Sequence, residues 1–415
     1  MKTKILILLL LILFNTTISA LTFNITLLND GIDHNPGDGI CEVSVGSDQC
    51  TLRAAVMEAN ALGGLQTIEL GPFVYELTLL GEDDTAIAGD LDVTFGDISI
   101  NGSGFDTVIN GNGNNRLFEV FNGRSLKLSN LTLTGGRAAT ASHNGGGAIQ
   151  IINTGTQLFT DHVIITNNSA NTGGGLFASH GTDINIYNTT FIDNDTEDLG
   201  FTNIWGPAIY CVGCEMFITK SIFTSNDMGG NAIEITGNGY LAMTNSTMTD
   251  NQGGGIRTSN GSAKIRFSTF VSGSGPNFSH YSFDDTHVVD IGSSILQTLE
   301  DNFLNNCIGG DKPISSGYNI VSDSSCEFSA VGDSEMTDAL LADITDNGGP
   351  TETYLPDVSS PAIDWVPVNL CISAQNNALK LDQRGKFRPD GEFCDSGAVE
   401  LNLDVIFRDH FEFTE

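Results

Sequence analysis

The sequence predicts an all-β fold, a single-stranded parallel β-helix (a solenoid) with a capping α-helix at its N-terminal end. The first observation is a repeated phrase of alternating apolar and small polar residues, as in SLKLSNLTLTGG, QLFTDHVIITNN and DINIYNTTFIDN. Six copies, aligned on their last large apolar residue, lie 32, 26, 32, 25 and 22 residues apart. A repeat of about 27 residues in strand chemistry is typical of stacked β-coils, because one coil cannot bury its inward face alone. The aligned residues are expected to form one inward column: Leu133, Ile165, Phe191, Phe223, Met248 and Phe270.

The second observation is the distribution of glycine and asparagine. Gly-Gly-Gly runs at 145–147, 173–175 and 253–255 supply sharp corners, where a positive φ costs little. Asparagines recur just after the strands, where stacked side chains can hydrogen-bond from coil to coil. The expected members of such a ladder are Asn188, Asn194, Asn226 and Asn251.

The third observation is one convincing helix in TLRAAVMEANALGG. Its apolar residues recur at i, i+3, i+4 and i+7, and Gly63 and Gly64 end it. An open β-helix end exposes unpaired backbone and bare core, so an amphipathic helix there is interpreted as a lid. Leu52, Val56 and Ala59 are expected to cover the first coil.

Residues 1–20 are expected to be a secretory signal rather than part of the fold. Lys2 and Lys4 precede an apolar stretch that ends in a small-residue site with cleavage after Ala20. No later apolar run is long enough to span a bilayer, so the mature chain is expected to be secreted, without a transmembrane segment. The formal charge of −34 becomes −36 when both lysines are removed. Such a surface repels nucleic acid, anionic lipid and acidic polysaccharide.

Eight cysteines in an exported chain predict disulfides, and all eight fall into sequence-local pairs. Local pairing suits a solenoid, in which residues far apart in sequence lie many coils apart. The CxxC of the second pair is also compatible with a redox site or half of a zinc site, but no second CxxC accompanies it. The predicted pairs are Cys41–Cys50, Cys211–Cys214, Cys307–Cys326 and Cys371–Cys394.

The chain is expected to divide into a signal (1–20), an N-terminal cap (21–64), a β-helix (65–400) and a tail (401–415). The coils are regular from Ser125 to about Ser274, and from about 275 the strand-like pieces lie between longer loops. In the late segment, Arg384 is expected to bind turn carbonyls or a carboxylate through its planar fork.

Several segments resemble a known family. CTLRAAVMEANA, after the Asp/Gly-rich GDGICEVSVGSDQC, resembles the opening motif of secreted bacterial CSLREA-domain proteins. The segments DNGGPTETYLPDVSSPAIDW and LDQRGKFRPDGEFCDSGAVEL are similar to the C-terminal module called choice-of-anchor Q. The turns at Gly146-Gly147-Ala148 and Gly174-Gly175-Leu176 are similar to those of polymorphic outer-membrane protein repeats. The resemblance implies a right-handed parallel β-helix on an exported, surface-associated protein, and it implies no known reaction.

The preferred function is a non-catalytic, adhesin-like surface or extracellular-matrix protein that contacts glycans or cell-surface components, with no nucleic-acid partner. No catalytic residue and no cofactor is predicted. Calcium is the one metal for which the sequence offers a cluster of oxygen ligands, in the loop DGIDHNPGDGICE, although EF-hand spacing is lacking. The candidate ligands are Asp30, Asp33, Asp38 and Glu42.

The alternative function is a β-helix polysaccharide lyase or glycoside hydrolase. A lyase needs carboxylates that hold Ca²⁺ and a basic residue that removes a proton, and an inverting hydrolase needs two acids across a groove. Asp161-His162 is the nearest candidate pair, but the same slot in other coils holds unrelated residues, so a solvent-facing structural position is favoured. The acidic loop at Asp193, Asp195, Glu197 and Asp198 is interpreted as solvated, with Arg257 and Arg266 one coil later.

Overall fold

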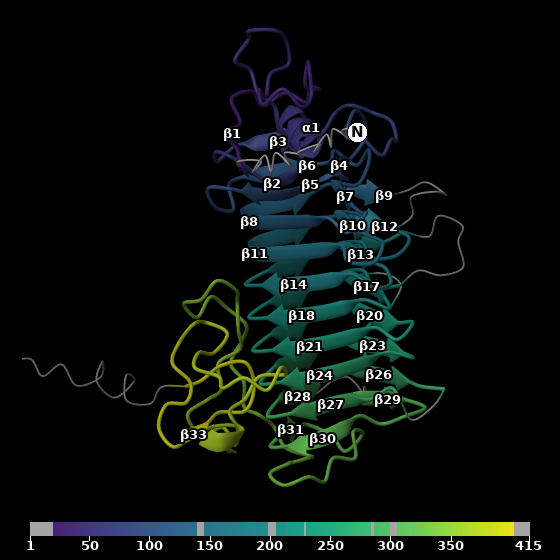
Figure 1. Ribbon diagram of the computed structural model, residues 1–415. Coiled ribbons are helices and arrows are strands. Elements are labelled where there is room, and N and C mark those ends of the chain that lie inside the picture. The colour runs from purple at the N-terminus through teal and green to yellow at the C-terminus, as the bar shows by residue number, and fades with distance from the viewer. Residues whose placement is uncertain are drawn as a thin grey trace, which may run out of the picture.

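The computed structural model describes residues 20–138, 145–197, 205–227, 230–283, 286–298 and 305–401. Over these residues the chain forms a parallel β-helix, and Figure 1 shows its rungs stacked from α1 at one end to β31 at the other. The predicted fold class is therefore confirmed. Residues 1–19 of the predicted signal and residues 402–415 of the tail lie outside the described residues.

Three parallel sheets form the sides of the solenoid in the described part of the chain. The 19-stranded sheet contains β1 (Thr22–Asn24), β2 (Gly64–Glu69), β3 (Val74–Glu76), β5 (Gly96–Asn101), β6 (Val108–Asn110), β8 (Ser125–Thr134), β11 (Gln157–Thr166), β14 (Asp183–Tyr187), β15 (Thr190–Ile192), β18 (Glu215–Thr219), β19 (Ile222–Thr224), β21 (Tyr240–Thr244), β22 (Thr247–Thr249), β24 (Ser262–Arg266), β25 (Thr269–Ser272), β27 (Val289–Gly292), β28 (Ile295–Thr298), β30 (Ile314–Gly317) and β31 (Ile320–Val321). The nine-stranded sheet contains β4 (Leu91–Val93), β7 (Phe118–Val120), β10 (Ile149–Ile151), β13 (Leu176–Ala178), β17 (Ile209–Val212), β20 (Ile233–Thr236), β23 (Ile256–Ser259), β26 (Phe278–Tyr281) and β29 (Cys307–Gly309). The short third sheet contains β9 (Arg137–Ala138), β12 (Ser169–Ala170) and β16 (Asp195–Thr196).

The 19-stranded sheet is bent into two strips. The ten-residue strands β8 and β11 run through both strips, whereas the next coil divides the same run into β14 and β15. At the bend each coil places one residue in the left-handed region, for example Asn130, His162, Asn188 and Lys220. Asn and His are among the residues that tolerate this conformation best, so the repeated Asn marks the corner.

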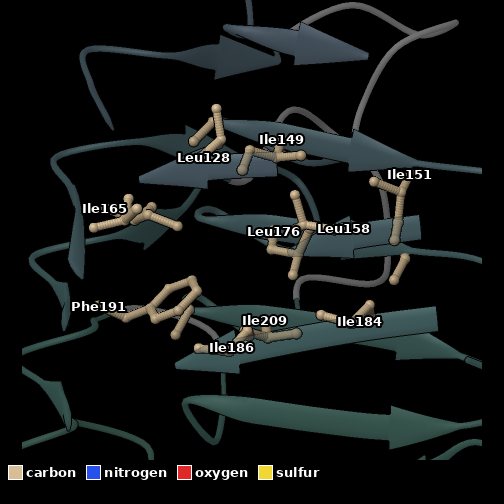
Figure 2. Packing of buried hydrophobic residues seen from close by; sticks show 14 of the residues in the cluster. Leu128, Ile149, Ile151, Leu158, Ile165, Leu176, Ile184, Ile186, Phe191 and Ile209 are labelled. Carbon is tan, nitrogen blue, oxygen red and sulfur yellow. The ribbon is translucent and has the colours of Figure 1, made fainter. Parts of the chain in front are cut away.

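The predicted column forms the core. Leu133 pairs with Ile165, Ile165 with Phe191, and Phe191 with Phe223, and the register continues through Met248 and Phe270. All six are at most 1% exposed. Figure 2 shows Ile165 and Phe191 on successive rungs, packed toward the side chains of the nine-stranded sheet. The column extends beyond the predicted set at both ends, through Tyr75, Ile109, Leu296 and Val321.

A buried asparagine ladder runs beside this core. The amide of Asn168 donates to Asn194, Asn194 donates to Asn226, and Asn226 donates to Asn251, at 2.9–3.0 Å. Three of the four predicted members are therefore confirmed. Asn188 is a correction: it lies at the corner of the large sheet with a φ of 47° and donates to Asp161 instead. The repeated phrase has asparagines both at the sheet corner and in the ladder, and the sequence alone does not tell which asparagine takes which position.

Helix α1 (Leu52–Leu62) lies over the N-terminal end of the solenoid (Figure 1). Thr51 caps it by accepting a hydrogen bond from the backbone N–H of Ala54 at 3.0 Å, and Gly63 follows its last residue with a φ of 69°. Leu52, Val56 and Ala59 are buried against the first strands, as expected for a lid.

All four predicted disulfides are present, with sequence separations of 9, 3, 19 and 23 residues, and the eight cysteines leave no free thiol. The CxxC pair Cys211–Cys214 closes the turn between β17 and β18, where both sulfurs are buried. In the disulfide-bonded form neither sulfur is a free thiolate that could bind zinc.

The expectation that coils continue to residue 400 needs correction. Up to residue 401, where the described part of the chain ends, the last parallel bridge joins Ile320 to Ser334. Residues 335–401, which we call the C-terminal arm, turn back and lie along the outside of the large sheet (Figure 1). The arm contains antiparallel bridges, the antiparallel pair β32 (Val366–Pro367) and β33 (Phe393–Cys394), and the 3₁₀ turn η1 (Val368–Leu370). Its sequence spaces short apolar pieces with Pro and Gly, and lacks the alternating runs that a coil requires.

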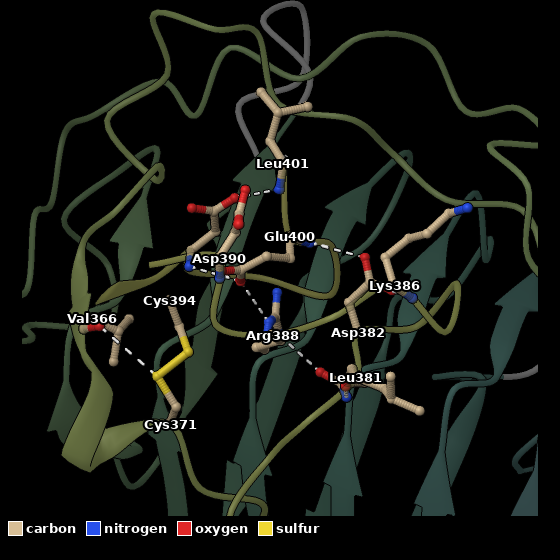
Figure 3. A network of polar contacts seen from close by, with 12 residues as sticks. Val366, Cys371, Leu381, Asp382, Lys386, Arg388, Asp390, Cys394, Glu400 and Leu401 are labelled. Carbon is tan, nitrogen blue, oxygen red and sulfur yellow. Dashed lines mark hydrogen bonds and ion pairs between the residues drawn. A yellow bond between two sulfur atoms is a disulfide. The ribbon is translucent and has the colours of Figure 1, made fainter. Parts of the chain in front are cut away.

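Buried polar contacts hold the arm to the coils. Arg388 donates from Nε to Glu400 and from Nη1 to the side-chain oxygen of Asn245, both at 2.8 Å, and Figure 3 shows Arg388 beside Glu400. The hydroxyl of Thr247 in β22 donates a hydrogen bond to the side-chain oxygen of Gln383 at 2.7 Å. Arg384 donates to the Asp382 carboxylate and to the backbone carbonyl of Glu400, the two kinds of partner expected from the sequence.

Candidate functional site

A hollow of about 340 Å³ lies on the outer face of the first strip of the large sheet, where the C-terminal arm reaches β18. Its floor comes from three successive strands, β11, β14 and β18, and its one lining residue from outside the coils is Gln375 of the arm. We call it the aromatic hollow. Its lining residues are Phe159, Asp161, Asn185, Ile186, Tyr187, Phe217, Thr219 and Gln375.

The strand register explains why aromatic rings gather there. Alternate residues of a strand face the same side, so Phe159, Asn185 and Phe217 form one outward column across three rungs. Asp161, Tyr187 and Thr219 form the neighbouring column. Phe159 is 37% exposed, and Tyr187 and Phe217 are half-buried. Three aromatic rings thus face solvent in this hollow, and the polar groups that line it are a carboxylate, side-chain amides and a hydroxyl.

The carboxylate of Asp161 is held in place by its neighbours. Its Oδ1 lies 2.8 Å from Nδ1 of His162 and accepts a hydrogen bond from the Asn188 amide at 2.9 Å. Both partners sit at the left-handed corner positions of successive coils. Asp161 and His162 are each more than a third exposed, in agreement with a solvent-facing position. The Asp161 side chain also lines the hollow, where its carboxylate can act as an acceptor.

Two lysines flank the rings. Lys127 Nζ lies 5.2 Å from the centre of the Phe159 ring, and Lys220 Nζ lies 5.9 Å from that of Tyr187. Burial lowers the pKa of Lys220, and the charge of Asp382 partly offsets this. Burial, followed by the charge of Asp161, raises the pKa of Tyr187. The Tyr187 hydroxyl therefore stays neutral near pH 7 and can donate as well as accept a hydrogen bond.

The structure does not bring the predicted calcium ligands together. Asp30 binds the buried guanidinium of Arg53 at 2.6 Å and accepts two backbone N–H groups from the first coils. Asp33, Asp38 and Glu42 each accept hydrogen bonds from the backbone of their own loop. These hydrogen bonds and the ion pair shape the loop, and calcium binding by the four residues stays a prediction. Burial raises the pKa of Asp33 to about 6.

Within the described residues, one group of carboxylates is close enough to share a metal ion, and no sequence motif indicated it. Asp90, Asp92 and Glu119 have oxygens within 4.8 Å of one another, and all three are buried. The buried guanidinium of Arg116 lies 3.3 Å from both Asp90 and Glu119. Burial and the charge of Asp90 raise the pKa of Asp92 to about 9. Arg116 supplies the positive charge, so we interpret the group as a structural ion-pair network.

Three of the other charged candidates, Glu197, Arg257 and Arg266, form ion pairs. Glu197 of the acidic loop binds Arg137 at 2.7 Å and Ser169, while Asp198 lies outside the described residues. Arg266 binds Asp290 on the large sheet. Arg257 binds Glu234 on the outer face of the nine-stranded sheet, with its guanidinium 4.6 Å from the centre of the Trp205 ring. The two arginines thus lie on different sheets and do not face an acidic groove together.

Apart from Asp161, sequence reasoning missed the residues of the aromatic hollow. A signal was available for three of them, because Phe159, Tyr187 and Phe217 occupy outward positions in three consecutive copies of the repeated phrase. Gln375 had no such signal, because it reaches the hollow from more than 150 residues further along the chain. A larger hollow of about 630 Å³ follows the seam between the coils and the arm, but its one aromatic residue, Tyr354, is tied to Thr249 at 2.7 Å.

Comparison with known proteins gives little beyond the fold. No family model matches the chain, and no curated protein matches it. A solved structure, the crystal structure of pectate lyase Pel9A, aligns over 93% of this chain and 98% of its own, with a TM-score of 0.48 and 14% identity. At that level the likeness carries no argument about function. Among the described residues no helix is long and apolar enough to cross a membrane.

Proposed function

We propose that this chain is an exported β-helix protein that binds neutral glycans in the aromatic hollow and works as an adhesin-like surface or extracellular-matrix protein. The observation that carries the proposal is the set of three outward aromatic rings on successive rungs, bordered by Asp161, Asn185 and Gln375. The signal-like residues 1–20, the four disulfides and the resemblance to CSLREA-domain and choice-of-anchor Q proteins support the exported, surface-associated setting.

The chemistry of the lining groups favours a sugar ligand. The C–H-bearing face of a pyranose ring is apolar and packs on an aromatic ring, while its hydroxyl groups need partners at the rim. Phe159, Tyr187 and Phe217 supply the rings, and the Asp161 carboxylate and the side-chain amides supply acceptors and donors. An entirely apolar ligand would leave these polar groups desolvated without partners.

Charge favours a neutral glycan over an acidic one. The chain carries a formal charge of −34, which repels polyanions at long range. Inside the hollow the charged side chain is the carboxylate of Asp161, and the two nearby lysines lie against ring faces. A uronate would meet the Asp161 carboxylate, whereas a neutral hydroxyl can donate to it.

The test is affinity electrophoresis of the mature protein through gels that contain single polysaccharides, neutral or uronate-rich. Neutral glycans should retard the protein. Phe217→Ala should weaken binding by roughly tenfold or more, about 1.4 kcal/mol. Phe177→Ala, which removes a half-buried ring from the outer face of the nine-stranded sheet, is the matched control and should bind like the parent. Absence of retardation by every glycan, or equal losses in both variants, would contradict the proposal.

The second candidate function is a polysaccharide lyase, and Lys220 is the observation that favours it. Its amine is nearly buried beside the hollow, and its lowered pKa increases the fraction able to act as a base. A lyase must also neutralise the uronate carboxylate, yet the hollow contributes the single carboxylate of Asp161 as a metal ligand. Incubation with a uronate panel, with and without Ca²⁺, followed at the absorbance of unsaturated products, decides between the two functions. We expect no product.

A further inference from the structure

The face that carries the aromatic hollow is open at one end and closed at the other. One outward column runs along the solenoid axis through Lys127, Phe159, Asn185, Phe217 and Ala242. Lys127, on the N-terminal side, is exposed. Ala242 faces outward just beyond Phe217, yet it is 1% exposed. The strip therefore changes from open to covered within two rungs of Asn185.

The C-terminal arm is what closes the strip. Thr244, on the same strand as Ala242, accepts the backbone N–H of Ala374 at 3.0 Å, and Lys264 one rung further donates to Asn376 at 2.7 Å. These two arm residues flank Gln375, whose side chain is exposed and lines the hollow. The arm thus places Gln375 across the column at the covered end of the hollow.

The arm is firmly held at this point. Asn376 and Asn377 form a turn with the backbone of Ser373, and Ser373 also caps it through its hydroxyl. Two residues before Ser373, the Cys371–Cys394 disulfide ties the segment to β33. The backbone that carries Gln375 is therefore held across the column, because both its neighbours are bonded to the sheet and a disulfide lies just before the turn.

The rings indicate the direction of a bound chain. Phe159 and Phe217 lie in the same column two rungs apart, so a line through them runs along the solenoid axis. Rungs are spaced by about 4.8 Å, close to the length of one pyranose unit in an extended chain. A glycan on this line would place about three units on β11, β14 and β18 before it met Gln375.

We propose that the aromatic hollow recognises the end of a linear neutral glycan, with the terminal unit against Gln375 and the chain leaving over Phe159 toward Lys127. This inference rests on the proposed function and specifies its ligand class. An internal segment of a polymer cannot occupy the same line, because its continuation would run into the arm at Ala374 and Asn376. Gln375 acts by direct contact, as the residue that selects chain ends.

The experiment counts binding sites on size-graded fractions of dextran, laminarin and mannan. For whichever glucan or mannan binds, recognition of ends predicts that tenfold shorter chains hold about tenfold more protein per gram, because they have tenfold more ends. Binding to internal segments predicts an amount per gram that does not change with chain length, and this result would overturn the inference while the proposed function stands. If no fraction binds, both fail.

Two variants sharpen the result. Gln375→Ala should weaken binding of short chains about fivefold, because the terminal unit loses its polar partner. Gln157→Ala is the matched control: this exposed outward glutamine lies on β11 at the edge of the strip, outside the hollow, and should behave like the parent. If both variants bind short chains like the parent, Gln375 is not the end-selecting residue and the inference fails. Circular dichroism and an unchanged melting temperature confirm that both variants are folded.

Discussion

Truncation of one ring in the core should destabilise a limited number of coils by several kcal/mol. Phe191 is fully buried, pairs with Ile165 and Phe223 on adjacent rungs, and stacks on the Phe223 ring at 4.9 Å with 13° between the planes. Replacement of a buried Phe by Ala typically costs about 3–5 kcal/mol. The stacked neighbour favours the upper half of that range, because stacking contributes about 0.5–1.5 kcal/mol beyond the buried area.

The assay is native-state hydrogen exchange resolved by strand. Each coil of a solenoid contacts its neighbours alone, so the loss should concentrate in the coils of β11, β15 and β19. A loss of 3 kcal/mol corresponds to more than about 100-fold faster exchange there. Phe283→Ala, at a ring that is 92% exposed, is the control and should leave exchange unchanged. A uniform change along the solenoid, or less than about fivefold at β15, would refute the reasoning.

Three further predictions concern polar groups. Asn226→Ala interrupts the buried ladder between Asn194 and Asn251 and should lower the free energy of unfolding in urea by about 1–3 kcal/mol. An unchanged urea midpoint would mean that the ladder does not contribute to stability. Gln383→Ala leaves Thr247 and Thr351 without their partner, so hydrogen exchange should accelerate within residues 335–401 and not in β8. Acceleration in both places would mean that the C-terminal arm does not open independently of the coils. Burial, then the charge of Glu400, raises the pKa of Asp395 to about 7, so its contribution to stability is fully present below about pH 4 and is lost as pH rises to about 7. Asp395→Asn should flatten the curve of melting temperature against pH between about pH 4 and 7. An unaltered curve would show that another group causes the pH dependence.

The period of the sequence was sufficient to predict the coils. The column from Leu133 to Phe270 and the four disulfides depend on contacts that are local or one coil away, and these recur with the repeated phrase. The predicted helix follows from an apolar stripe and its flanking Thr51 and Gly63. Such features need no knowledge of distant parts of the chain.

The features that the sequence did not predict depend on contacts between distant parts of the chain, or on which of several possible partners a side chain binds. The arm binds residues such as Asn245 from about 140 positions away in sequence, and no local pattern encodes that distance. The predicted calcium loop is a separate case, and calcium binding there stays a prediction. Its carboxylates accept backbone N–H groups nearby or, for Asp30, pair with Arg53, and a count of acidic residues does not reveal those partners.

The most direct test of the account is a crystal structure of the mature protein with a short linear oligosaccharide of the neutral glycan that binds best. We predict sugar rings packed on Phe159 and Phe217, with hydroxyl groups on Asp161 and the terminal unit against Gln375. A well-defined ligand on another surface, such as the outer face of the nine-stranded sheet around Trp205 and Arg257, would contradict the central claim.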